Sequence, residues 1–511
     1  MAVQTITQRV SQGADAVETT PSARAGNIAS FAVAISLAAF FLATSLYISS
    51  HRLLWFDEVV TVHLARLADW TTLLSALSHG VDSLPPAYYI VVRAFDKLFG
   101  DREVAIRLPS TLAMVATLLI TFDCARRLTD GLHGLIALAI AAAPLAGEGF
   151  EARSYAIYVM FAALALWVWV SVRPGNKWRP VLFGAVLFLG VSFHYYAVLL
   201  LVPFALWELS RWKPWQPPSA MLIAGIIGVG LPAVLLSHFI LSFSRKFSTG
   251  FWSHPSLSEL MDIYSRIFVG GSFVLALAIV WIVLVDRKDN VVALLPMQSG
   301  EAIGWLFLCV PLVGFVAAEL KTNAFAVRYF LGIVPGVAVA LSACIGRHFR
   351  NAQLVSLGIF LLLATWGVVK QVQIVRHPES VETPGTRDIL NLESLLNSDG
   401  KRFVLFSDPF QFLEVQYYSQ HPDACILLLP SHLGQETSST HSSPDPYLHQ
   451  RVELLLSQYY PLQFWQPDQL REHARQTALI KPRPEVLDTM RQAGFDVETR
   501  LSKPVEVVYL Q

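Results

Sequence analysis

An acidic pair, Asp57-Glu58, directly follows the first long apolar stretch of the chain. A carboxylate held at a membrane boundary and partly removed from water can act as a general base, because its surroundings tune its affinity for a proton. Helix capping is the alternative, since aspartate is a favoured N-cap residue and Val60, Leu64 and Leu67 follow at helical spacing. We predict that both carboxylates belong to the catalytic site. Asp57 projects into a cavity as the base, whereas Glu58 begins the helix and can turn toward the lipid headgroups, unless it orients Asp57 or contacts the acceptor.

Further polar clusters interrupt the apolar pattern of the chain at several points. Each has an ordinary structural explanation, such as a rigid turn, a snorkelling arginine, a surface ion pair or an aromatic belt. Arginine at membrane depth is nonetheless expensive unless it faces protein or a polar ligand. We therefore predict a substrate-binding site formed by Asp82, Tyr88, Tyr89, Arg107, Arg153, Tyr155, His194, Tyr195, Lys321, Arg328 and Tyr329.

The composition indicates what kind of structure must position these residues. The chain has 511 residues, of which 54% are hydrophobic and 15% charged, and its mean hydropathy of +0.48 excludes a soluble globular protein. Apolar runs long enough to cross a bilayer recur up to about residue 370, which predicts about 11 to 13 spans. The 38 basic and 38 acidic residues balance, so nothing indicates a nucleic-acid partner. The spacing of the four cysteines indicates neither a disulfide framework nor a zinc site.

Lysine and arginine residues predict the orientation of the spans, because cytoplasmic loops retain them. Five basic clusters fall on one side if residues 51–104 contain an even number of crossings; they lie at 126–127, 173–179, 211–213, 287–288 and 347–350. With that side cytoplasmic, the loop 50–106 and everything after about Gln371 lie on the opposite face. We read residues 85–99 as a short, half-inserted helix preceded by an interfacial helix that begins near Trp70. Residues 242–267 are expected to form a mobile loop that closes over the acceptor.

The predicted fold class is a polytopic α-helical membrane protein with a small C-terminal α/β domain. Residues 1–26 are expected to form a cytoplasmic tail and residues 27–371 the membrane domain, with 50–106 as its catalytic first extracytoplasmic loop. Residues 372–511 are expected to form a soluble extracytoplasmic domain. Its predicted elements are strands at 402–407 and 424–429 around a helix at 410–419, a flexible loop at 431–446, a helix at 484–493, and strands at 495–500 and 505–510.

The order and spacing of the polar motifs resemble those of membrane-embedded C-type glycosyltransferases, in particular the bacterial branch related to protein O-mannosyltransferases and to aminoarabinose transferases of lipid A. The resemblance rests on Asp57-Glu58, Pro85-Pro86-x-Tyr88-Tyr89, Phe99-Gly100 before Arg107-Leu-Pro-Ser110, Glu151-x-Arg153-x-Tyr155, His194-Tyr195-Tyr196, and Arg328-Tyr329 with Pro335. The family often has His or Lys just before the double proline, whereas this chain has Leu84. A contact made from that position would then fall to Asp82, Lys97 or Lys321.

This resemblance implies an enzyme that moves a sugar from a polyprenyl-phosphate donor to a lipid, glycan or protein acceptor outside the cytoplasm. Asp57 would be the catalytic base. Arginines fixed in a low-dielectric cavity stabilise the charge of a leaving phosphate, and Arg153 and Arg328 are the candidates for this role. No metal or other cofactor is expected, and direct displacement would invert the anomeric centre. A bacterial inner-membrane location follows from the same resemblance.

Two other classes of protein share some of these sequence features. A secondary transporter is also polytopic, but it should show repeat symmetry and broken helices at matching positions in two halves. We see no such duplication in the sequence. A non-catalytic lipid-binding or envelope assembly protein, with the C-terminal domain as its working part, remains open at this point.

Overall fold

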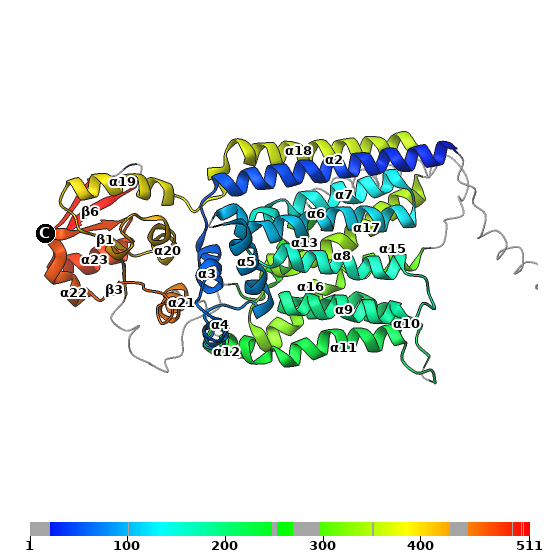
Figure 1. Cartoon of the computed structure of the whole chain (residues 1–511), viewed down its shortest axis with the longest axis horizontal. Coiled ribbons are helices and arrows are strands. Elements are labelled where there is room, and N and C mark those ends of the chain that lie inside the picture. Colours follow the sequence, from blue (N-terminus) through cyan, green and yellow to red (C-terminus); the bar gives the residue numbers. More distant parts are fainter. Residues whose placement is uncertain are drawn as a thin grey trace, which may run out of the picture.

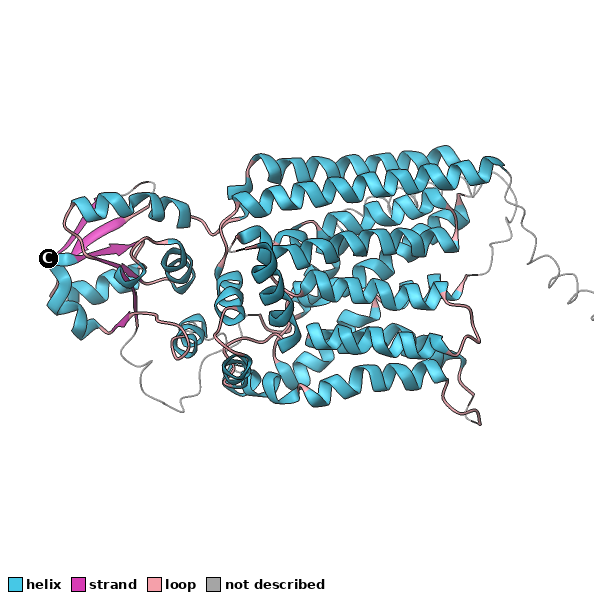
Figure 2. Cartoon of the chain, in the orientation of Figure 1, coloured by secondary structure: helices cyan, strands magenta, loops and turns pink. Residues whose placement is uncertain are grey.

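The structure is a computed structural model, and it describes residues 21–100, 102–213, 215–247, 253–268, 297–349, 352–429, 448–492, 494–501, 503 and 505–510. A bundle of helices is joined to an α/β domain at one of its ends (Figure 1). Figure 2 shows that the strands of the described residues lie in the C-terminal domain and that the bundle consists of helices joined by loops.

Five helical segments of the described residues are long and apolar enough to cross a membrane. Three are the N-terminal helix α2 (Pro21–His51), α6 (Glu103–Leu128) and α18 (Gln353–Arg376). The others are the run of α15 (Ser299–Leu306), α16 (Cys309–Ala317) and η4 (Ala318–Thr322), and the run of η5 (Val327–Ile333) and α17 (Val334–His348). A multi-pass membrane protein follows, which confirms the predicted fold class.

Shorter or bent apolar helices complete the bundle. They are α7 (Gly131–Leu145), α8 (Tyr155–Ser171), α9 (Trp178–Phe193), η2 (Tyr195–Leu200), α10 (Leu201–Arg211), and the pair α11 (Ala220–Leu235) and α12 (Ser237–Phe247), which is bent by 58°. The predicted total of about 11 to 13 spans stays a prediction, because residues 269–296 lie outside the described part of the chain.

Glycines let two helix pairs of the bundle approach closely, as is common between membrane helices. A Cβ atom added at Gly228 of α11 would lie 2.4 Å from the carbonyl oxygen of Gly184 in α9. A Cβ atom added at Gly304 of α15 would lie 2.5 Å from the carbonyl oxygen of Gly336 in α17. Any larger residue at Gly228 or Gly304 would push the two backbones apart.

Three short helices lie at the end of the bundle that faces the C-terminal domain: α3 (Phe56–Ala65), α4 (Trp70–Ser78) and α5 (Pro86–Phe99) (Figure 1). The predictions of short helices near Trp70 and at residues 85–99 are therefore confirmed. The expectation of a long loop at 242–267 is wrong for the described residues, which belong largely to α12 and to α13 (Leu257–Phe268). Leu260 and Ile263 are buried on one side of α13, so helical amphipathicity accounts for the difference.

The C-terminal domain contains a six-stranded sheet in the order β3-β2-β1-β4-β6-β5. Its strands are β1 (Phe403–Phe406), β2 (Cys425–Leu428), β3 (Phe464–Trp465), β4 (Thr477–Ile480), β5 (Val497–Leu501) and β6 (Val507–Leu510). The first four are parallel, whereas β6 runs antiparallel to β4 and β5. The helices are η6 (Pro378–Val381), α19 (Thr386–Ser398), α20 (Pro409–Tyr418), η7 (Pro422–Ala424), α21 (Leu448–Leu456), α22 (Pro467–His473), η8 (Ala474–Gln476) and α23 (Pro484–Gln492).

The predicted β-α-β unit corresponds to β1, α20 and β2, and the predicted final elements correspond to α23, β5 and β6. The prediction missed β3, which has two residues, and β4, whose four residues are all buried and therefore show no alternation. The loop expected at residues 431–446 lies outside the described residues.

Because the C-terminal domain contacts α3, it must lie on the same side of the membrane as Asp57. We predict that this side is extracytoplasmic, since Arg126, Arg127 and Arg347 of the basic clusters lie in the last turns of α6 and α17. A reporter that is active only in the cytoplasm should be silent when fused after Gln511 and active when inserted at Gly175. The opposite pattern in intact cells would overturn this orientation.

Candidate active site

Asp57 lies in the first turn of α3, and its side chain is 18% exposed. Arg328 Nη1 lies 3.3 Å from Asp57 Oδ2, and Arg153 Nε lies 3.8 Å from the same oxygen. Asp57, Arg153 and Arg328 line a small cavity of about 60 Å³ together with Asp82, Tyr155 and other residues. The structure thus directs Asp57 into a cavity that two arginines share.

Asp82 is the main partner of Arg153. Arg153 Nη1 donates to Asp82 Oδ2 at 2.7 Å and to Thr61 Oγ1 at 3.1 Å, and the Tyr89 hydroxyl donates to Asp82 Oδ2 at 2.7 Å. Burial alone would raise the pKa of the Asp82 carboxyl, but the charge of Arg153 and the hydrogen bonds from Arg153, Tyr89 and the Ser83 N–H together lower it. Asp82 and Arg153 therefore form a buried ion pair at the floor of the cavity.

Glu58 does not face the headgroups as we predicted. Its side chain is fully buried and forms a bidentate ion pair with Arg107, with distances of 2.7 Å from Nε to Oε1 and 2.6 Å from Nη2 to Oε2. Arg52 lies 3.6 Å away, and the backbone N–H of Ala152 donates to Glu58 Oε1 at 2.6 Å. Burial would raise the pKa of Glu58, but the charges of Arg107 and Arg52 and the hydrogen bonds from Arg107 and the Ala152 N–H together lower it.

Arg107 is occupied by the protein itself. Besides Glu58, it donates to the backbone carbonyls of Ser49, Arg52 and Leu53 at 2.9 to 3.0 Å, and it is fully buried. Such a saturated guanidinium avoids the cost of an unpaired buried charge. Arg107 therefore sits in the core rather than in a substrate cavity, which differs from the predicted binding role.

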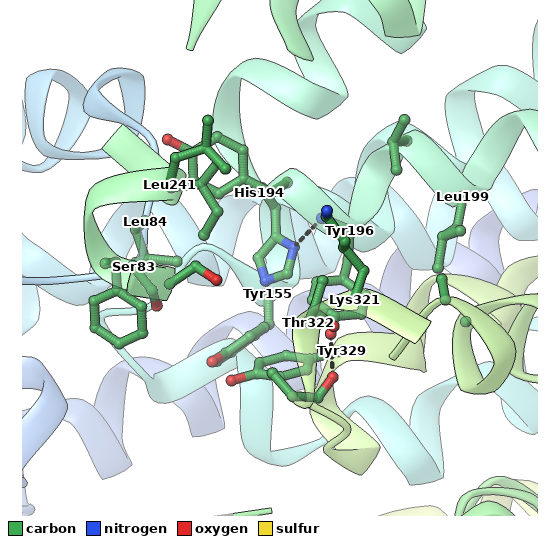
Figure 3. Close-up of a pocket in the computed structure, with 18 residues that line it drawn as sticks. Ser83, Leu84, Tyr155, His194, Tyr196, Leu199, Leu241, Lys321, Thr322 and Tyr329 are labelled. Atoms are coloured by element: carbon green, nitrogen blue, oxygen red, sulfur yellow. Dashed lines mark hydrogen bonds between the residues drawn. The ribbon is translucent and has the colours of Figure 1, made fainter. Parts of the chain in front are cut away.

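A second cavity, of about 340 Å³, adjoins the first one and shares Ser83, Tyr155, Phe243 and Tyr329 with it. Figure 3 shows aromatic and polar side chains around this cavity, including His194, Tyr155 and Tyr329, with Lys321 and Thr322 nearby. The remaining lining is mostly apolar and comes from η2, α12 and α16, with Leu84 from the loop before α5. The second cavity therefore combines an apolar wall with a polar end next to Asp57.

The structure brings most of the predicted site residues together. The small cavity contains Asp57, Asp82, Arg153, Tyr155, Arg328 and Tyr329, and the larger one contains Tyr155, His194, Tyr195, Lys321 and Tyr329. Glu58, Tyr88, Tyr89 and Arg107 are buried and line neither cavity. Glu151 pairs with Arg52 at 3.7 Å rather than with Arg153.

Sequence reasoning missed several contributors to the site. His449 and Val452 of α21 line the small cavity beside Asp57, although they are almost 400 residues later in the chain. The Arg328 guanidinium lies over the rings of Trp55 and Tyr155, at 5.7 Å and 5.5 Å from their centroids. Trp55 lies two residues before Asp57, so its place beside the site could have been predicted from the Asp57-Glu58 motif. Nothing in the local sequence around His449 indicates that it lies at the site.

Within the described residues, no group of three or more His, Cys, Asp or Glu side chains is placed to hold a metal ion. The charged groups that surround Asp57 are instead the guanidinium groups of Arg153 and Arg328. Independence from metal ions stays a prediction.

Residues 83–238 match the model of a family described as dolichyl-phosphate-mannose-protein mannosyltransferase. This match covers the motifs from Pro85 to Tyr196 and supports the resemblance over that part of the chain. No curated protein sequence matches the chain significantly.

Two crystal structures of ArnT from Cupriavidus metallidurans are similar to this chain. The structure bound to undecaprenyl phosphate has a TM-score of 0.59 at 11% sequence identity, and the match covers 93% of this chain and 97% of that one. The apo structure gives the same TM-score and identity over 94% and 98% of the two chains. The similarity therefore extends over nearly the whole of both proteins and confirms the C-type fold.

We expect the Glu58–Arg107 pair to be essential for stability. Replacing Arg107 by Met should lower the free energy of unfolding by about 3 to 5 kcal/mol, because it leaves Glu58 charged and buried without its main partner. Thermal unfolding of the purified protein measures the loss, and the double variant Glu58→Gln/Arg107→Met should regain part of it.

The matched control is Arg126→Met, since Arg126 pairs with Asp123 at a partly exposed site where the loss should be below about 1 kcal/mol. Equal losses in Arg107→Met and Arg126→Met would contradict a special role for the buried pair.

Proposed function

We propose that the protein is a glycosyltransferase that moves a sugar from a polyprenyl-phosphate donor to an extracytoplasmic acceptor, with Asp57 as the catalytic base. The observation that carries the proposal is the common cavity of Asp57 and Arg328, which adjoins a larger apolar cavity. The family match over residues 83–238 supports glycosyltransferase activity in general. The similar fold of a transferase crystallised with undecaprenyl phosphate supports a lipid-linked donor.

The donor would occupy the two adjoining cavities. Leu84, Leu199 and Leu241 offer an apolar wall that suits an isoprenoid chain. Lys321, at the same cavity, and Arg328, at the smaller one, offer the positive charge that suits its phosphate. Arg328 is the better candidate of the two predicted arginines, because its side chain is 27% exposed whereas Arg153 is 5% exposed and bound to Asp82.

The reaction would be a direct displacement at the anomeric carbon. A hydroxyl oxygen of the acceptor forms the new bond to that carbon while the bond to the phosphate oxygen breaks, which inverts the anomeric centre. The hydroxyl proton passes to the Asp57 carboxylate. The electron pair of the broken bond leaves on the phosphate, whose growing charge is stabilised by Arg328. This step needs no metal ion.

The acceptor would meet the C-terminal domain beside Asp57, because His449 and Val452 line the small cavity there. The acceptor would be a lipid, glycan or protein outside the cytoplasm. The enzyme would lie in the bacterial inner membrane. A non-catalytic assembly protein or a transporter would share the fold's apolar cavity but would not transfer sugar from a polyprenyl-phosphate donor.

The role of Asp57 predicts the behaviour of Asp57→Asn. Asparagine keeps the size of the side chain and one acceptor oxygen but cannot take up the proton, so transfer at saturating donor should fall by roughly 100-fold or more while donor binding survives. Asp123→Asn is the matched control. Asp123 lies near the C-terminal end of α6, whereas the end that contacts α3 is the N-terminal one, so this variant should transfer at close to the normal rate. Near-normal transfer by purified, folded Asp57→Asn would refute the assignment.

The role of Arg328 predicts weaker donor binding in Arg328→Leu. The loss should be about 2 kcal/mol or more, as expected when a desolvated charge partner of a ligand is removed. Binding of a polyprenyl phosphate to the purified protein measures it directly. Arg266→Leu, which removes an exposed arginine of α13 outside both cavities, should bind normally. Equal affinities in the two variants would show that Arg328 does not hold the phosphate.

A further inference from the structure

The segment that joins α2 to α3, residues 51–56, is held by side chains of the C-terminal domain. Four of its backbone groups take part: the carbonyl of His51 and the N–H groups of Leu53, Leu54 and Phe56. Their partners are Arg387 Nη2 at 2.9 Å, Glu382 Oε1 at 2.9 Å, Tyr418 Oη at 2.8 Å and Glu414 Oε1 at 3.0 Å, in that order. The chain that leads into Asp57 is therefore positioned from the distant end of the sequence.

Glu414 makes the contact nearest to Asp57. It lies in α20, is 1% exposed, and accepts the backbone N–H of Phe56, the residue directly before Asp57. The first N–H groups of a helix have no partner within it, and the tryptophan at the N-cap position of α3, Trp55, offers no acceptor in its side chain. Glu414 supplies that acceptor from another domain, at the helix end where a carboxylate is most favourable.

Glu414 is itself fixed by two hydroxyl groups. Thr383 Oγ1 donates to its Oε1 at 2.6 Å, and Thr386 Oγ1 donates to its Oε2 at 2.7 Å. With Phe56, each carboxylate oxygen has at least one donor. A rotation of the Glu414 side chain would break these bonds. The two threonines therefore fix the position of Oε1, the oxygen that accepts the Phe56 N–H at the start of α3.

Packing between the domains supports the same arrangement. The Phe56 ring lies 5.0 Å from the Phe410 ring and 5.3 Å from the His449 ring. Phe410 belongs to the same helix as Glu414, and His449 also lines the Asp57 cavity. The C-terminal domain therefore contacts both the backbone and the ring of Phe56, and it also lines the cavity that contains Asp57.

We propose that Glu414 is a positioning residue for the transfer reaction: it fixes the first turn of α3 and thereby the direction of the Asp57 carboxylate. The inference rests on the proposed role of Asp57 as the base. Glu414 lines neither cavity, so it acts through the backbone of Phe56 and not on the substrate.

The chemistry of the contact distinguishes two substitutions. Glu414→Gln keeps an oxygen for the Phe56 N–H, and its amide can donate to the Thr386 hydroxyl, whereas Glu414→Leu removes every acceptor. Burial raises the pKa of Glu414 to about 7, so the neutral carboxylic acid that glutamine imitates is already populated near neutral pH. The amide should therefore replace the carboxyl group with little loss.

The test uses the full-length protein and measures kcat and the KM for the donor. Glu414→Leu should lower kcat by about 10- to 100-fold, the effect of displacing a catalytic group by a fraction of an ångström to 1 Å, with an unchanged donor KM. Glu414→Gln should restore kcat to within a few-fold of wild type. Tyr418→Phe is the matched control, because it removes a contact from the same helix to Leu54, farther from Asp57, and should lower kcat much less.

Two outcomes would overturn the inference. One is a normal kcat in Glu414→Leu; the other is an equal loss in Glu414→Leu and Tyr418→Phe together with a lower unfolding temperature, which would mean that Glu414 only docks the domain.

The double variant Asp57→Asn/Glu414→Leu separates this inference from the proposed function. If Glu414 acts through Asp57, the double variant is no slower than Asp57→Asn alone. Multiplied losses would reject the positioning role and leave the base assignment intact. Normal transfer by Asp57→Asn would reject the proposed function instead.

Discussion

The buried ion pair between Glu58 and Arg107 is the interaction on which the rest of the site depends. It joins the first turn of α3 to α6, and through Arg107 it also holds the carbonyls of Ser49, Arg52 and Leu53 at the end of α2. Successive residues of a helix point about 100° apart. Because Glu58 is anchored inward, Asp57 cannot point the same way, and it turns toward the cavity that contains Arg328.

Three arginines in this region differ in how deeply the protein buries them. Arg107 is fully buried and saturated, Arg153 is 5% exposed and bound mainly to Asp82, and Arg328 is 27% exposed beside Asp57. A fully buried guanidinium whose donors all have protein partners stabilises the fold, whereas a guanidinium that is partly exposed at a cavity can also contact a ligand. The same residue type therefore serves as a core element in one position and as a candidate phosphate ligand in another.

The different burial of these three arginines could not be predicted from the sequence. Apolar runs identified the helical membrane fold, and the strand pattern around residues 403–428 identified the β-α-β unit, because both signals are local. The motifs placed Asp57, Arg153 and Arg328 on one face correctly. Local sequence could not say that Glu58 and Arg107 neutralise each other, since their pairing spans 49 residues, nor that Glu414 reaches Phe56 across 358 residues. Partners that meet only through the tertiary fold decide which polar residues stay available for chemistry.

The central claim is that Asp57 supplies the base, and chemical rescue tests it most directly. Asp57→Ala removes the carboxylate and enlarges the cavity at a position where the native side chain is 18% exposed, so a small carboxylate such as formate can enter and take up the proton. We predict that single-turnover transfer from a polyprenyl-phosphate sugar is lost in Asp57→Ala and is restored as the formate concentration rises, with no such restoration in Glu58→Ala. Transfer by Asp57→Ala at the wild-type rate without formate would contradict the account.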